Sequence, residues 1–196
     1  ALYGALIDAH RESGALSRAH GVCSHALARG VLPAAAPLRA LLVALAHAGR
    51  SGDALEICAE ARQVHGLRLG ADDPAALALL ETAAAAPSDL DARSVMQELS
   101  AHVGGGASFS DASAAGFGDA AAAAAAAETD ELAELQETAL SLCLQHGNLR
   151  AARVVIDAQP LRSPRAVDAL LVALLDADEI ADARRLYGRA AAEGER

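Results

Sequence analysis

A helical hairpin occupies residues 1–34 and is the feature that most limits what this chain can fold into. Apolar residues recur at helical spacing on both sides of a break at Gly14. The hairpin closes with Gly30 and Pro33. Glycine takes the left-handed conformation that ends many helices, and a proline shortly after it prevents their continuation.

The hairpin is followed by a second copy of itself. A single shift of the sequence superposes Leu6 and Ile7 on Leu41 and Leu42, Gly14 on Gly49, Ala19 on Ala54, and Cys23 on Cys58. A period of about 35 residues with two helices in each unit is typical of helical-repeat proteins. We therefore predict an all-α fold, a right-handed α-α superhelix (solenoid) of stacked helix-turn-helix repeats.

Three fainter copies extend the pattern and set the predicted domain organisation. The segment ALLVAL occurs at residues 40–45 and again at 169–174, which makes these two segments equivalent first helices. Helix starts are indicated at Asp73-Pro74 and at Ser163-Pro164. We predict three hairpins in residues 1–103 (1–35, 36–70 and 71–103), a Gly/Ser/Ala-rich linker in 104–128, and two hairpins in 129–196 (129–162 and 163–196).

Within the predicted linker, the composition changes along the segment. Residues 104–119 are rich in Gly and Ser, which is typical of a flexible connection. Residues 120–127 are all alanine and have high helix propensity, so they are candidates to extend the helix that follows.

Composition favours a core of small and aliphatic side chains. Hydrophobic residues make up 53% of the chain, but aromatic residues only 2%. Alanine contributes little buried area, so we expect stability to come from the stacking of neighbouring hairpins. Apart from the alanine tract, no apolar stretch is long enough to cross a membrane, and no membrane partner is expected.

The first unit carries a cluster of candidate metal ligands, His20, Cys23 and His25. His20 and Cys23 share a helical face, as the ligands of a soft metal would. The alternative is that Cys23 is a small core residue, and Cys58 at the equivalent position favours it. No second ligand pair lies at zinc-site spacing, so we predict no metal site.

No motif indicates an enzyme. The sequence has no Gly-rich phosphate loop after a strand, no nucleophile elbow and no His–carboxylate constellation. We expect no catalytic residue, no cofactor and no small-molecule substrate.

The first unit resembles a pentatricopeptide repeat. The marks are Tyr3, the Leu6-Ile7 pair, Gly14, Ala19 and the Gly30-x-x-Pro33 ending, and they extend over residues 1–66. The tetratricopeptide repeat is the alternative, with a similar period. It is disfavoured because its Trp, and its Pro after each second helix, do not occur at regular positions.

The resemblance implies a role in organellar RNA metabolism or translation, with RNA or a ribonucleoprotein as partner. Such proteins bind single-stranded RNA at one base per repeat. The implied base-reading positions are Gly4 with Ala34, and Arg39 with Gly70. The family's usual reading residues are absent there, which implies an RNA-associated adaptor or ribosome-associated subunit with little base-specific readout. The implied location is a mitochondrion or chloroplast, with any targeting segment expected upstream of Ala1.

Charge favours a different partner. The net charge is −10, and acidic residues gather on the predicted first helices. An acidic groove repels phosphates, which bind to basic side chains. The alternative function is thus a protein-protein interaction scaffold whose acidic groove, made of Asp8, Glu12, Glu81, Glu134, Glu137 and Asp168, holds a basic protein partner. Candidate phosphate contacts lie on the second helices: Arg150, Arg153, Arg184, Arg185 and Arg189.

Overall fold

The computed structural model describes residues 2–86, 89–104, 118–158 and 163–194, and it confirms the all-α prediction. In these residues there are ten helices and no strand. None of these helices is both long and apolar enough to cross a membrane. The helices are α1 (Leu2–Glu12), α2 (Leu16–Ala28), α3 (Ala35–His47), α4 (Ser51–His65), α5 (Pro74–Ala85), α6 (Asp89–Gly104), α7 (Gly118–Gln145), α8 (Leu149–Ala158), α9 (Pro164–Asp176) and α10 (Ile180–Gly194).

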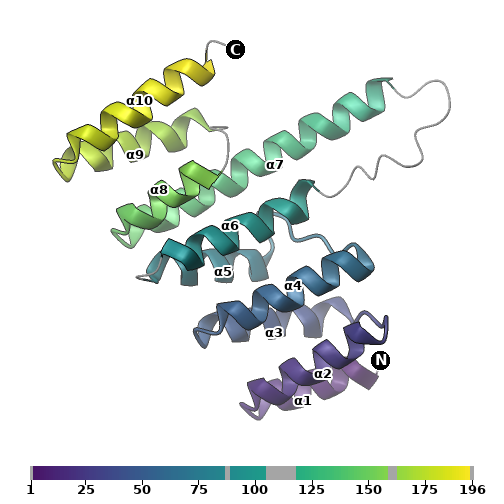
Figure 1. The fold of residues 1–196 in the computed structure, drawn as a ribbon. Coiled ribbons are helices and arrows are strands. Elements are labelled where there is room, and N and C mark those ends of the chain that lie inside the picture. The colour runs from purple at the N-terminus through teal and green to yellow at the C-terminus, as the bar shows by residue number, and fades with distance from the viewer. Residues whose placement is uncertain (1, 87–88, 105–117, 159–162, 195–196) are drawn as a thin grey trace.

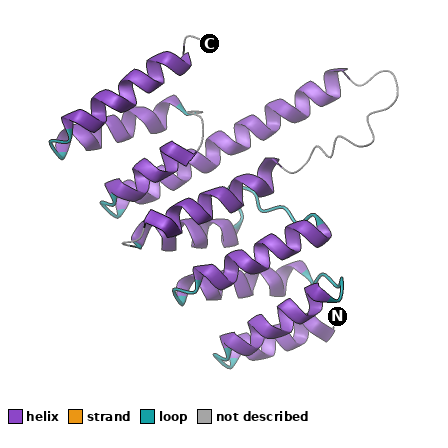
Figure 2. Cartoon of the chain, in the orientation of Figure 1, coloured by secondary structure: helices purple, strands orange, loops and turns teal. Residues whose placement is uncertain are grey.

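Consecutive helices form hairpins, and the hairpins lie side by side in two layers (Figure 1; Figure 2 shows the same view by secondary structure). One layer contains α1, α3, α5, α7 and α9, each in contact with the next. The other contains α2, α4, α6 and α8 in the same way. In the described residues, no Cα atom of α10 lies within 8 Å of one in α8, so the second layer opens at its end.

The core lies between the layers and contains a small side chain at the same place in every hairpin. The sequence superposes five alanines of the second helices, and all five are at most 4% exposed. Small side chains let the backbones of packed helices approach closely. These alanines are Ala19, Ala54, Ala92, Ala152 and Ala183.

Two helix starts occur where the sequence predicts them. The Asp73 carboxylate accepts a hydrogen bond of 2.9 Å from the Ala75 N–H, and Pro74 is the first residue of α5. The Ser163 hydroxyl oxygen accepts one of 3.3 Å from the Ala166 N–H at the start of α9. Both bonds satisfy N–H groups that a helix cannot satisfy internally.

The alanine tract extends the helix that follows it, as its composition predicts, so this helix begins before the predicted linker boundary at residue 128. Helix α7 begins at Gly118 and includes the whole alanine tract, because alanine has the highest helix propensity of all residues. Residues 105–117, the Gly/Ser-rich part of the predicted linker, lie outside the described residues.

Four hairpins whose turns the structure describes turn in the same way. The second residue after the first helix has a positive φ, and the next N–H donates to the carbonyl five residues earlier, as in the common C-terminal motif of helices. Glycine occupies this position in three hairpins, with φ of 66° to 74°, whereas Asp178 occupies it in the fifth, with φ of 61°. These bonds run from Ala15 to His10, Arg50 to Leu45, Asn148 to Cys143 and Glu179 to Leu174, at 2.8 to 2.9 Å.

Asp178 therefore carries backbone strain that glycine would relieve. We expect Asp178→Gly to raise the free energy of unfolding by about 0.5–1 kcal/mol, because a side chain in the left-handed region costs roughly that much. The reciprocal change, Gly49→Ala, should lower it by about 1 kcal/mol. Urea denaturation of both variants beside the unchanged protein measures these effects. A loss of stability in Asp178→Gly would show that the aspartate side chain stabilises the turn.

His102 is a buried titratable group between two hairpins. Its ring is 1% exposed, and its Nδ1–H donates to the Leu67 carbonyl at 2.8 Å. Its Nε2 lies 3.4 Å from Glu98, which is itself paired with Arg62 at 3.0 Å. Burial lowers the pKa of His102 below 6.5, and the Leu67 carbonyl and Glu98 offset only part of that effect.

This lowered pKa makes stability depend on pH. Between pH 6.5 and the lower folded-state pKa of His102, the unfolded chain binds a proton at this residue that the native chain does not. The free energy of unfolding should therefore fall as the pH falls through this window. Urea titrations at several pH values should show a shallower fall in His102→Gln than in the unchanged protein. Equal slopes would mean that His102 titrates alike in both states.

Candidate interaction surface

Acidic and polar side chains gather on the outer face of α7. Residues 130, 134, 137, 141 and 145 recur at three- and four-residue intervals, so they share one face of the helix. They line a groove, here called the α7 groove, and a second hollow beside it reaches α9 and adds Arg165. The α7 groove is lined by Asp130, Ala133, Glu134, Glu137, Thr138, Ser141, Leu142 and Gln145.

The structure brings together only part of the predicted acidic groove. Glu134 and Glu137 lie together in the α7 groove. Asp168 is exposed on the neighbouring helix α9, and Glu81 is exposed on α5. Asp8 and Glu12 belong to α1, at the other end of the stack, where the Arg11 side chain lies 3.4 Å from each of them.

The first pair of implied base-reading positions lies together, without room for a reading side chain. Gly4 is buried, and a Cβ placed on it would lie 3.2 Å from Pro37 Cγ and 3.8 Å from Ala34 Cβ. Ala34 itself is exposed. Gly4 thus acts in the structure as a contact between the first and second hairpins.

The second pair lies among carboxylates. Arg39 Nε donates to the Asp73 carboxylate at 2.6 Å, although 42% of the Arg39 side chain stays exposed. A Cβ placed on Gly70 would lie 2.9 Å from a Glu131 oxygen and 3.1 Å from an Asp72 oxygen. A phosphate at this position would meet acids on both sides, and Arg39 is already paired.

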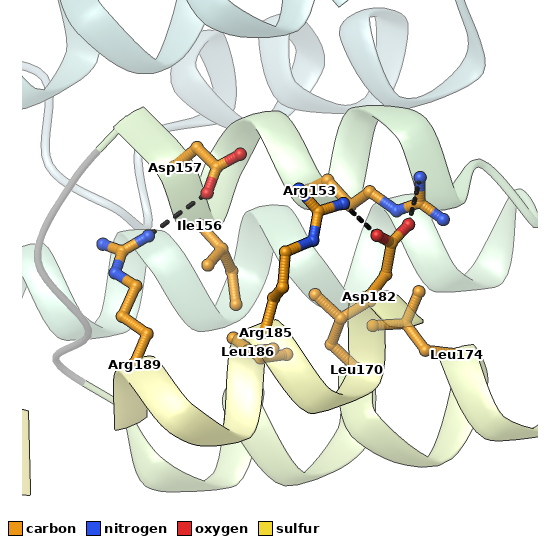
Figure 3. Close-up of a pocket in the computed structure, with 9 residues that line it drawn as sticks. All are labelled: Arg153, Ile156, Asp157, Leu170, Leu174, Asp182, Arg185, Leu186 and Arg189. Atoms are coloured by element: carbon orange, nitrogen blue, oxygen red, sulfur yellow. Dashed lines mark hydrogen bonds and ion pairs between the residues drawn. The ribbon is translucent and has the colours of Figure 1, made fainter. Parts of the chain in front are cut away.

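The predicted phosphate contacts divide into two groups. Arg153, Arg185 and Arg189 line a cavity of about 160 Å³ between α8 and α10, with Leu170 and Leu186 among its apolar lining (Figure 3). Arg150 and Arg184 are exposed and do not line this cavity.

Carboxylates of α8, of α10 and of the turn between α9 and α10 balance the arginines of the cavity. Arg153 contacts Glu179 and lies 2.7 Å from Asp182, and Arg189 lies 3.2 Å from Asp157. A hydrogen bond from Arg185, and then the charge of Arg153, lower the pKa of the Asp182 carboxyl. These ion pairs bridge the opening between α8 and α10 and reduce the positive charge offered to a phosphate.

The three cysteines belong to the core. Burial raises the pKa of Cys23 and Cys58 to about 12 and that of Cys143 to about 11. Their buried thiols are protonated at neutral pH, as is typical of structural cysteines. The interpretation of Cys23 as a core residue is confirmed, since its side chain is fully buried.

Sequence reasoning missed Ser141 and Gln145 as parts of the α7 groove, because it searched the first helices for charged residues. The available signal was their spacing from Glu134 and Glu137, which continues the same helical face toward the end of α7.

Asp73 combines two roles that substitution can separate. It caps α5 and pairs with Arg39, and it is 7% exposed. Asp73→Ala should lower the free energy of unfolding by about 1–2 kcal/mol, because it removes the cap and leaves Arg39 unpaired. Asp73→Ser keeps a capping oxygen and should cost less than half as much. Equal losses in thermal or urea denaturation would show that the ion pair, and not the cap, carries the effect.

Comparisons of this chain with protein-family models, with characterised proteins and with solved structures gave no match.

Proposed function

We propose that this chain is a segment of a right-handed α-α solenoid, similar to pentatricopeptide proteins, and that it acts as a protein-interaction scaffold. Its α7 groove binds an arginine- or lysine-rich segment of a partner protein. The serial contacts within each helix layer support the solenoid. The observation that carries the function is the uncompensated negative charge of the groove.

The acids of the groove are not neutralised within the described part of the chain. Asp130, Glu134 and Glu137 form no salt bridge among the described residues, and the one hydrogen bond described for these side chains is donated by the Ser163 hydroxyl to Glu137 at 3.2 Å. Asp130 and Glu134 are exposed, as is Glu137. Like charges kept together on one face attract cationic groups and speed their association.

The spacing of the groove suits an extended basic peptide. Four residues of α-helix separate Asp130 from Glu134, a rise of about 6 Å. Alternate side chains of an extended peptide lie about 6.6 Å apart, so arginines at every second position match the spacing of Asp130 and Glu134. Ser141 and Gln145 offer hydrogen bonds beyond Glu137. Each exposed ion pair contributes only about 0.2–1 kcal/mol, so we expect modest affinity that falls with salt.

A second candidate function is an RNA-associated adaptor of organellar RNA metabolism or translation, as the resemblance implies. The exposed Arg150 and Arg184, on α8 and α10, favour it. The carboxylates around Arg39 and Gly70 disfavour base reading on the opposite layer. In this version RNA contacts the second-helix layer through phosphates.

The experiment is a binding titration with two probes, a labelled peptide of alternating Arg and Ser and a labelled single-stranded RNA. We expect the purified chain to bind the peptide, with affinity falling several-fold between about 50 and about 200 mM salt as the charges are screened. Glu134→Gln/Glu137→Gln should weaken peptide binding about tenfold. The matched control, Asp8→Asn/Glu12→Gln, removes two acids of α1 and should leave peptide binding unchanged.

The outcomes separate the two candidate functions. Equal losses of peptide affinity in the α7 and α1 double variants would show that binding depends only on net charge. That result would overturn the α7 groove as the binding site. Tight, salt-dependent RNA binding that Arg150→Ala/Arg184→Ala removes, without peptide binding, would establish the adaptor in place of the scaffold.

A further inference from the structure

The structure brings one histidine and two carboxylates together from two different helices, so spacing along a single helix does not predict this cluster. His20 lies on α2, and Asp53 and Glu56 lie on α4. One ligand atom from each of the three side chains lies within 4.8 Å of the other two. The residues are 33 and 36 positions apart in the sequence, about one repeat, so the cluster joins the first hairpin to the second.

The imidazole of His20 lacks a hydrogen-bond partner at the nitrogen that faces this cluster. Its Nε2 is buried and accepts or donates no hydrogen bond in the structure. The nearest carboxylate oxygen, of Glu56, is 3.8 Å away, which is too long for a hydrogen bond. A buried polar atom left in this way is unfavourable, and a bound cation between the two groups would satisfy it.

We propose that His20, Asp53 and Glu56 bind a zinc ion. One imidazole nitrogen and two carboxylate oxygens are ligands that Zn²⁺ accepts, and three protein ligands leave a fourth position for water. Metal–ligand distances of about 2.0–2.2 Å place tetrahedral ligands about 3.4 Å apart, so rotation of the side chains closes the cluster around the ion. Glu56 is 63% exposed and His20 is 20% exposed, which leaves a path for entry.

Arg50 acts as a supporting residue in this site. Its guanidinium contacts Oδ2 of Asp53, and it also donates a hydrogen bond of 2.9 Å to the Ser17 hydroxyl. The other oxygen of Asp53 is thus available to the ion, while Arg50 holds the carboxylate in place, as neighbours of metal ligands commonly do. Its positive charge also weakens the attraction of the cluster for a cation.

A bound ion would join α2 to α4. Because the three ligands come together only in the folded chain, zinc binding should raise the thermal unfolding temperature. The site lies on the first two hairpins and in the second-helix layer, away from the α7 groove, so neither proposal depends on the other.

The test is calorimetric titration of the EDTA-treated, desalted chain with zinc chloride, paired with thermal unfolding. We expect binding of one ion per chain and a higher unfolding temperature with zinc than without. Glu56→Gln and His20→Ala should each weaken binding by at least about tenfold, since each removes a ligand. Glu56→Gln is the decisive variant, because an exposed side chain can change without disturbing the core.

The matched control is His25→Ala, which removes an exposed histidine of α2 that contacts Tyr3 and not the cluster. It should bind zinc as the unchanged protein does. Equal weakening by His25→Ala, or zinc binding that survives both ligand variants, would show an adventitious ion only and overturn the proposal. Absence of zinc binding to a chain with normal helical circular dichroism would overturn it as well.

Discussion

Close packing between neighbouring hairpins is the interaction on which the rest of this structure depends. A hairpin lined with alanine and leucine buries little apolar area by itself, so its stability comes from the hairpins on either side. Polar contacts about one repeat apart also join neighbouring hairpins. Such contacts join Arg39 to Asp73, Arg62 to Glu98, and Arg68 to the carbonyls of His102 and Val103.

The hairpins could be predicted because single residues mark the ends of their helices. Gly14 and Gly49 supply the positive φ of the turns, and Asp73 and Ser163 supply the caps. The start of α7 could not be placed in this way. The high helix propensity of its alanine tract predicts an extension of the helix, but the tract has no apolar periodicity or cap that fixes its first residue.

The candidate sites were harder to predict, since they depend on side chains that meet across hairpins. Periodicity places His20 and Cys23 on one helix, but it does not show which residues of the next hairpin lie opposite. The structure buries Cys23 and brings Asp53 and Glu56 to His20 instead. The acidic groove shows the same limit, because Asp8 is near Arg11 at one end of the stack while Glu134 lies in the α7 groove.

The implied reading positions show how a repeat surface can serve its own fold instead of a nucleic acid. A base-reading side chain must be free to meet a base, whereas Arg39 is paired with the residue that caps α5 in the next hairpin. Gly4 packs against Pro37, also in the next hairpin. Both positions hold neighbouring hairpins together: Gly4 has no room for a reading side chain, and the Arg39 side chain is already paired. A surface constrained in this way can still bind a partner through charge, which requires only that the acids of α7 stay exposed and unpaired. Stacking and base reading place competing physical demands on the same residues, and at Gly4 and Arg39 the contacts seen in the structure are contacts between hairpins.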